Sequence, residues 1–179
     1  MLLWGMCALA LALWLAFTYV DRPLKTEAAP MGMLSFELAG ERFIAQRIVE
    51  GWSPEARLRA AFGLGLDFLF IPCYSTCLVA GCVWASRPLG RRIELAAKVG
   101  GLLAWGQWIA ALADTGENVC LLSVLLSGGQ GGSPQAARLL SLMKFAIVAA
   151  GAALICAGIY QRVLDRLTRP RLLNRAVSR

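Results

Sequence analysis

Four long apolar blocks constrain the fold of this chain more than any other feature of its sequence. They cover about residues 2–20, 61–86, 95–126 and 136–160. Each is close to or above the ~20 apolar residues that an α-helix needs to cross a bilayer core. Charged residues make up 16% of the 179 residues, whereas soluble domains carry about 25%. The sequence therefore predicts an all-α, polytopic membrane protein, a four-transmembrane-helix bundle that forms a single membrane domain over residues 1–179.

The segment between the first two blocks predicts one further helix. Apolar residues such as Phe36, Ala39 and Phe43 recur there at helical spacing among charged ones. We expect an amphipathic helix over about residues 35–52, lying at the membrane surface or covering the bundle as a lid. Ser53 and Pro54 then form a helix start signal, and this helix should continue into the second span.

Charges beside the apolar blocks predict how the chain crosses the membrane. The loop at 87–92 and the tail at 161–179 are strongly basic, whereas the loop at 127–134 is uncharged and the first loop is balanced. Basic segments stay preferentially in the cytoplasm. We therefore expect both termini and the basic tail to be cytoplasmic, with the amphipathic helix and the glycine-rich loop outside. The first block has no clear cleavage site and is expected to remain as a span.

The strongest candidate for a functional site is the run from Asp114 to Asn118 inside the third block. Charged groups this far inside an apolar span are costly, and they commonly mark functional sites. At ~100° per residue, the polar residues of this run share one helix face. Counting ~1.5 Å per residue from the outer ends brings charged groups of three spans to one layer in the outer half of the membrane. The predicted binding residues are Asp67, Tyr74, Asp114, Glu117, Asn118 and Lys144.

This layer contains more acids than bases. Asp67, Asp114 and Glu117 oppose Lys144, which leaves a formal charge of −2 if all are ionised. Isolated charges are not tolerated in hydrocarbon, so we expect a retained proton or a bound cation. A purely structural interpretation stays open, in which Lys144, Asn118 and Tyr74 pair with the acids and the network only fixes helix register.

Composition limits the cofactors and partners. The chain has no His, which excludes His-based haem, metal and proton-relay sites. No cofactor is evident, although a divalent cation held by Asp67, Asp114 and Glu117 stays open. The net charge of +7 lies in short segments beside apolar blocks, which does not predict a nucleic-acid partner. The six cysteines all lie in apolar blocks, where free Cys usually acts as a small hydrophobe, and the sequence leaves their redox activity undecided.

Three stretches carry a resemblance to known proteins. They are Ser-Phe-Glu-Leu-Ala-Gly-Glu-Arg at 35–42, Leu-Asp-Phe-Leu-Phe at 66–70 followed by Tyr74, and Asp-x-x-Glu-Asn at 114–118. In these the chain is similar to small uncharacterised bacterial four-span membrane proteins with an outer amphipathic helix. The resemblance implies a multi-pass protein of the bacterial inner (cytoplasmic) membrane and the same site residues, but it implies no activity.

Three functions stay open on these observations. The first is a binding or transport protein whose acidic layer holds a cation, a proton or an amphiphile headgroup. The second is a structural or accessory subunit, since the small residues Ala149, Ala153 and Ala157 could mediate assembly as a homo-oligomer or with a partner membrane subunit. The third is a lipid-modifying enzyme that uses metal or acid–base chemistry, although no Ser/His pair or clear nucleophile is present and the catalytic residues stay unknown. Membrane lipid is the expected surrounding in each case.

Overall fold

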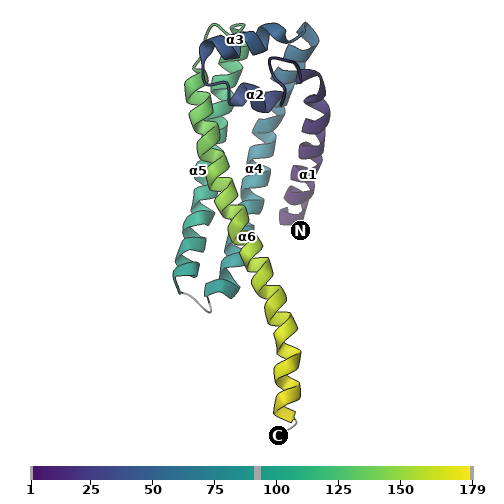
Figure 1. The fold of residues 1–179 in the computed structure, drawn as a ribbon, viewed down its shortest axis with the longest axis vertical. Helices are drawn as coiled ribbons and strands as arrows, with labels where there is room; N and C mark the ends of the chain where they lie inside the picture. Colours follow the sequence, from purple (N-terminus) through teal and green to yellow (C-terminus); the bar gives the residue numbers. More distant parts are fainter. Residues whose placement is uncertain (1, 91–93, 178–179) are drawn as a thin grey trace. The chain divides into compact units, whose positions relative to one another are not determined.

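The computed structural model describes residues 2–90 and 94–177, with side chains described for 2–90 and 95–168. Its elements, in chain order, are α1 (Leu2–Val20), a short 3₁₀ helix (Arg22–Leu24), α2 (Met33–Glu37), α3 (Arg42–Gly51), α4 (Pro54–Gly90), α5 (Glu94–Leu126) and α6 (Pro134–Val177) (Figure 1). The described residues form helices and no strands. This arrangement confirms the predicted all-α class.

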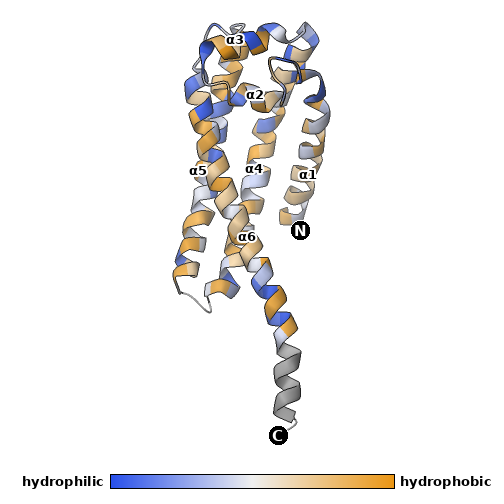
Figure 2. Cartoon of the chain, viewed as in Figure 1, coloured by the Kyte–Doolittle hydropathy of each residue, from blue (hydrophilic) through white to orange (hydrophobic). Residues whose placement is uncertain are grey.

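Four helices are long and apolar enough to cross a membrane, by their length and composition. These are α1, α4, the 95–126 part of α5 and the 134–168 part of α6. Figure 2 shows long hydrophobic stretches along each of them. Many of their large apolar side chains are exposed, for example Trp14, Leu102 and Leu139, as expected where lipid replaces water around the helices. The chain is a multi-pass membrane protein with four spanning helices.

Two of the long helices extend well beyond the predicted spans. The α4 helix begins at Pro54 and continues to Gly90, and the start signal acts as predicted, because Ser53 Oγ accepts a hydrogen bond from the Ala56 amide at 3.1 Å. The α6 helix runs to Val177, so part of the predicted tail is helical. In the two predicted basic segments, Arg91 and Arg92, and the side chains from residue 169 onward, lie outside the described residues.

The prediction of one continuous amphipathic helix over residues 35–52 is wrong. The chain forms two helices there, α2 and α3, separated at residues 38–41. Gly40 has a φ of 69°, in the left-handed region that glycine adopts at little cost, and the Glu41 amide donates to the Ala39 carbonyl at 2.7 Å. The turn at Gly40 therefore ends the helical path that the apolar spacing alone suggested.

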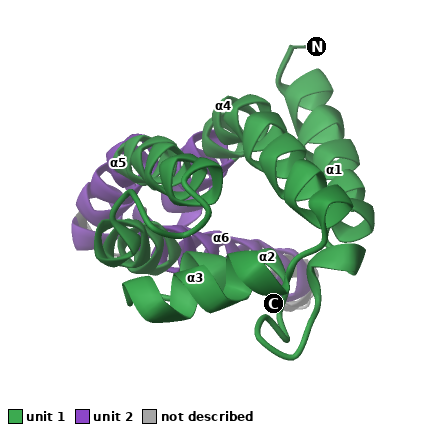
Figure 3. Cartoon of the chain, turned by 90° about the horizontal axis from the view of Figure 1, so that it is seen from above, with its two compact units in different colours: residues 1–77, 109–146 green, residues 78–108, 147–179 purple. Residues whose placement is uncertain are grey.

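The chain divides into two compact units, one of residues 1–77 with 109–146 and one of residues 78–108 with 147–179 (Figure 3). The first unit has a core in which α2 and α3 pack with the adjoining parts of the long helices. Trp52 lies at its centre, donating its indole N–H to the Leu24 carbonyl at 2.8 Å and meeting the Phe36 ring edge-on at 5.2 Å. The core residues are Leu24, Ala29, Phe36, Ala39, Ala45, Ile48, Val49, Trp52, Ala56, Ala60, Leu64, Leu121, Val124, Leu125 and Ala137.

The glycine-rich loop between α5 and α6 is a close-packed connection in this first unit. Gly129 has a φ of 88°, and a Cβ atom there would lie 2.5 Å from the Cα atom of Gln46 in α3. The loop therefore needs glycine both for its backbone conformation and for its approach to α3.

The second unit joins its helices through small residues and one amide. Gln107 is fully buried and donates to the Ile147 carbonyl at 3.2 Å, which joins α5 to α6. A Cβ atom on Gly151 would collide with the Gln107 amide, and one on Gly158 would lie 2.5 Å from Ala85 Cβ. Close approach of these helices therefore depends on glycine.

Candidate functional site

The α5 helix supplies three polar groups from one buried face. Asp114, Glu117 and Asn118 are 4%, 0% and 2% exposed, respectively. Their spacing of three and four residues places them side by side on a helix, and the small residues Ala110 and Ala111 continue the same buried face. This face belongs to the first unit, where the beginnings of α4 and α6 also lie.

Lys144 of α6 is the centre of the polar groups. Its Nζ atom lies 2.7 Å from Asp114 Oδ1 and 2.8 Å from Glu117 Oε2. The residue is 8% exposed, so its ammonium is bound by carboxylates in place of water. Such charge-assisted contacts are short and strong, and their removal leaves a buried charge without compensation.

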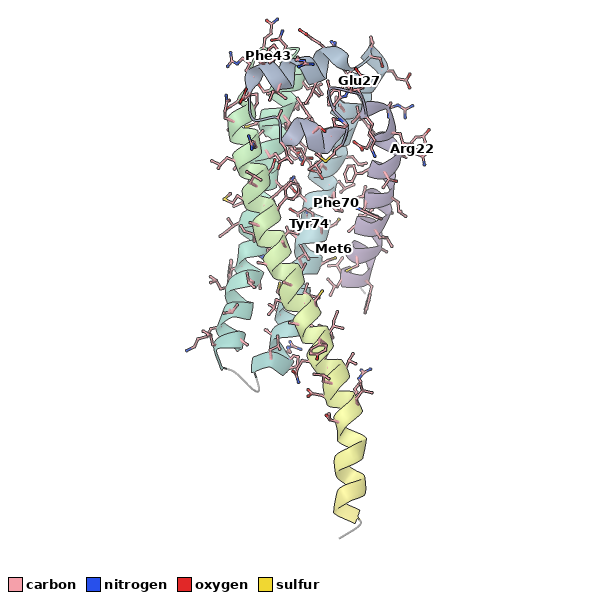
Figure 4. The ribbon with its side chains drawn as sticks, in the orientation of Figure 1. Met6, Arg22, Glu27, Phe43, Phe70 and Tyr74 are labelled. Carbon is pink, nitrogen blue, oxygen red and sulfur yellow. The ribbon has the colours of Figure 1, made fainter. Side chains whose placement is uncertain are left out.

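The α4 helix contributes two further groups. The Tyr74 hydroxyl donates to Asp114 Oδ2 at 2.8 Å, and Asp67 Oδ2 accepts a hydrogen bond from the Asn118 amide at 2.7 Å. Figure 4 shows Tyr74 one turn beyond Phe70 on this helix, and the two ring centroids are 5.1 Å apart. The six sequence-predicted site residues thus form two hydrogen-bonded or ion-paired groups: Asp67 with Asn118, and Tyr74, Asp114 and Glu117 around Lys144.

Sequence reasoning missed one acid of this site. Glu37, the last residue of α2, has its Oε2 atom 3.8 Å from Lys144 Nζ, with side-chain exposures of 17% and 10%. Its position among charged residues of an amphipathic segment indicated only a solvated face. The prediction that this segment covers the bundle as a lid implied that some of its residues lie near the site. The spacing of its apolar residues did not, however, distinguish Glu37 from Glu41, which is exposed.

Burial and charge act together on Glu37. Burial raises the pKa of this carboxyl to about 8; the Lys144 ammonium opposes the rise, and the neighbouring acids Glu117, Asp67 and Asp114 add to it. Glu37 therefore carries a proton at neutral pH and releases it in mildly alkaline solution.

We use the name acidic cluster for Glu37, Asp114 and Glu117 around Lys144. Among the described side chains, these three carboxyls surround a single ammonium, and Asp67, which is hydrogen-bonded to Asn118, is a fourth acid whose charge acts on Glu37. Glu117 is fully buried, and its Oε1 atom has no hydrogen-bond partner among the described residues. A buried carboxyl oxygen without a partner is costly, so this atom is the natural position for a proton or for a bound group.

The three sequence-predicted metal candidates take different partners in the structure. Asp67 bonds to Asn118, whereas Asp114 and Glu117 share Lys144. Within the described residues, no group of three or more Cys, Asp or Glu side chains has the arrangement needed to hold a metal ion. The ammonium of Lys144 occupies the position between two of the acids.

Comparison with known proteins gives no relative. No family model matches the chain, and neither a curated protein nor a solved structure is similar to it. The function must therefore be inferred from the site itself.

Proposed function

We propose that this membrane protein binds and releases protons at the acidic cluster, in the outer half of the bilayer. The observation that carries the proposal is the excess of buried carboxyls over the single Lys144 ammonium that they share. If Glu37, Asp67, Asp114 and Glu117 were all ionised, these four acids together with the Lys144 ammonium would carry a net formal charge of −3. An uncompensated charge of this size is not tolerated away from water, so the cluster must take up positive charge to be stable.

A proton is the favoured ligand because a cation already lies between the acids. The Lys144 ammonium is 2.7 Å and 2.8 Å from its two carboxylate partners, so a further metal or organic cation would need to displace a covalently attached one. A proton instead adds to a carboxyl oxygen such as Glu117 Oε1 without displacing any group. The formation of neutral carboxyls also lowers the desolvation cost of the site.

The position of Glu37 supports a route for the proton. Its carboxyl is the most exposed of the three in the cluster and stands on α2, outside the spanning helices. It contacts the same ammonium as Asp114 and Glu117, so the loss or gain of its proton changes the electrostatic environment of both acids. Glu37 thus acts as the proton acceptor on the side where α2 lies, with Lys144 linking it electrostatically to the acids of α5.

Proton uptake by the purified protein tests this proposal. We expect infrared difference spectra between pH 6 and pH 9 to show Glu37 losing its proton. Asp114→Asn with Glu117→Gln should remove most of that signal, because it removes two acids that raise the pKa of Glu37 and leaves Glu37 as the only acid in contact with Lys144, so that Glu37 loses its proton at lower pH. Glu41→Gln, which changes an exposed acid of the same outer segment, is the matched control and should leave the signal intact. Spectra of the double variant that equal those of the parent would overturn the proposal.

Transport is tested separately from binding. In proteoliposomes carrying a pH-sensitive dye, an acid pulse should enter faster with the parent protein than with the double variant. If the spectra show proton binding while protons enter both kinds of proteoliposome at the same rate, the cluster binds protons without moving them across the membrane.

A structural role is the second candidate, and the pairing of the network favours it. Tyr74, Asn118 and Lys144 each contact an acid at hydrogen-bond distance, as in a network that only fixes helix register. Lys144→Met alone should destabilise the protein strongly, by about 3–5 kcal/mol. If Lys144→Met with Asp114→Asn and Glu117→Gln restores stability and retains the infrared signal, the three groups serve packing alone.

A further inference from the structure

The contact between α1 and α4 is a narrow antiparallel seam. On α4 it uses Gly63, Phe70 and Cys77, spaced seven residues apart on one helix face. These meet Val20, Phe17 and Cys7 of α1, respectively. A Cβ atom on Gly63 would lie 3.4 Å from Val20, and the Phe17 and Phe70 rings meet edge-on with centroids 5.4 Å apart. The register of the two helices is therefore fixed at three levels.

The third level brings two thiols together. The Sγ atoms of Cys7 and Cys77 are 2.7 Å apart, and both residues are partly buried. This separation is longer than the S–S bond of a disulfide, which is about 2.0 Å, and both cysteines are free. The approach is set by the two neighbouring levels of the seam, so bond formation requires only a small movement of the two side chains.

The α1 helix has few other attachments. Leu13 is its one buried residue among those described, and large apolar side chains such as Leu11 and Trp14 are exposed on the rest of its surface. A covalent bond at residue 7 would therefore strongly restrain α1. It would act near the end of the helix that lies far from the 3₁₀ helix at Arg22–Leu24.

We propose that Cys7 and Cys77 are a redox-active pair, which a lipid-soluble quinone oxidises to a disulfide that fastens α1 to α4. In this step each thiol loses its hydrogen and the two sulfur atoms form a bond. The quinone accepts the two electrons and two protons and becomes the quinol. The site lies in two apolar spans, where an uncharged, lipid-soluble oxidant is favoured over a charged one. Thiols, quinone and quinol are all uncharged, so the reaction leaves no net charge in hydrocarbon.

Peptide mapping tests the pair directly. The parent protein, reduced and placed in lipid nanodiscs, is treated with a short-chain benzoquinone and then cleaved after Lys25, whose side chain is 58% exposed. Without reductant, we expect the 1–25 peptide to remain linked to the peptide that contains Cys77, and to separate when dithiothreitol is added. We also expect two fewer thiols to react with iodoacetamide, and the Tm to rise by several degrees.

Matched cysteine variants keep the test specific. Cys7→Ser and Cys77→Ser should each abolish the linkage. Cys73→Ser, which lies one turn away on α4, and Cys156→Ser, which is exposed on α6, should retain it. Oxidised glutathione, a charged oxidant, should form the linkage at least tenfold more slowly than the quinone. A linkage absent under quinone in the folded parent overturns the pair, and a faster reaction with glutathione overturns the quinone as its oxidant.

Discussion

Glu37 makes the stability of the first unit depend on pH in a defined direction. Its pKa is about 8 in the folded protein against 4.5 in the unfolded chain, because of burial. Between these values the folded state holds more protons, so the stabilising contribution is complete below about pH 4.5 and is lost as the pH rises through 8. The slope is at most ~1.4 kcal/mol per pH unit. Unfolding followed by the fluorescence of Trp52, which packs against Phe36 of α2, should show the free energy of unfolding decreasing between pH 6 and pH 9.

A neutral substitution at the same position isolates the effect. Glu37→Gln resembles the protonated acid, so we expect it to flatten the pH dependence and to stabilise the protein relative to the parent above pH 8. Glu41→Gln should retain the slope of the parent. Parent and Glu37→Gln curves that run parallel across this range would assign the pH dependence to other groups.

Single residues also show why the site could be predicted only in part. Asp114, Glu117 and Lys144 stand out because charged groups in apolar spans are rare and must find one another. The structure places both carboxylates within 2.8 Å of the Lys144 ammonium. Glu37 is flanked by polar residues, where an acid needs no partner. Only the fold of the 21–53 segment shows that this side chain turns toward Lys144, and that fold depends on contacts distant in sequence, such as the one between Met33 N–H and Asp21.

At the scale of elements, Gly40 decides that α2 and α3 are separate helices. It has a φ of 69°, and a Cβ atom there would lie 2.6 Å from the Arg138 side chain. We expect Gly40→Ala to destabilise the protein by about 1–2 kcal/mol, because other L-residues are strained in this conformation. Thermal unfolding followed by tryptophan fluorescence measures the loss.

Gly51 provides the matched control for this substitution. It lies at the end of α3, and a Cβ atom there would come no closer than 3.7 Å to a neighbour. Gly51→Ala should therefore leave the stability unchanged or raise it slightly. A Gly40→Ala variant as stable as Gly51→Ala would show that the chain can continue as one helix without loss.

Elements were predictable where one physical requirement dominates. The spans follow from hydrophobic length alone, and α1 has the predicted bounds of residues 2–20. Helix ends in water depend on capping and on local backbone geometry, which is why α4 and α6 exceed the predicted spans and α2 is so short. A periodic apolar pattern cannot show a break that a single glycine introduces, as it does between Phe36 and Phe43.

At the scale of the whole molecule, the distribution of basic residues predicts the orientation in the membrane. The loop after α5 is uncharged between residues 127 and 134, whereas six arginines lie between 162 and 179. This asymmetry predicts that the α6 end lies in the cytoplasm and the 127–134 loop outside. Gln130 and Thr168 are both exposed, and replacing either with cysteine changes no charge.

A membrane-impermeant maleimide applied to intact cells tests this orientation. It should label Gln130→Cys, and it should label Thr168→Cys only after the membrane is opened. The parent is the control, because its six cysteines lie in apolar segments and should react little in either state. Labelling of Thr168→Cys in intact cells would show that the chain has the opposite orientation. Gly129 of this loop packs against Gln46 of α3, next to α2 in the chain, so under the proposed function protons would then reach the acidic cluster from the cytoplasm.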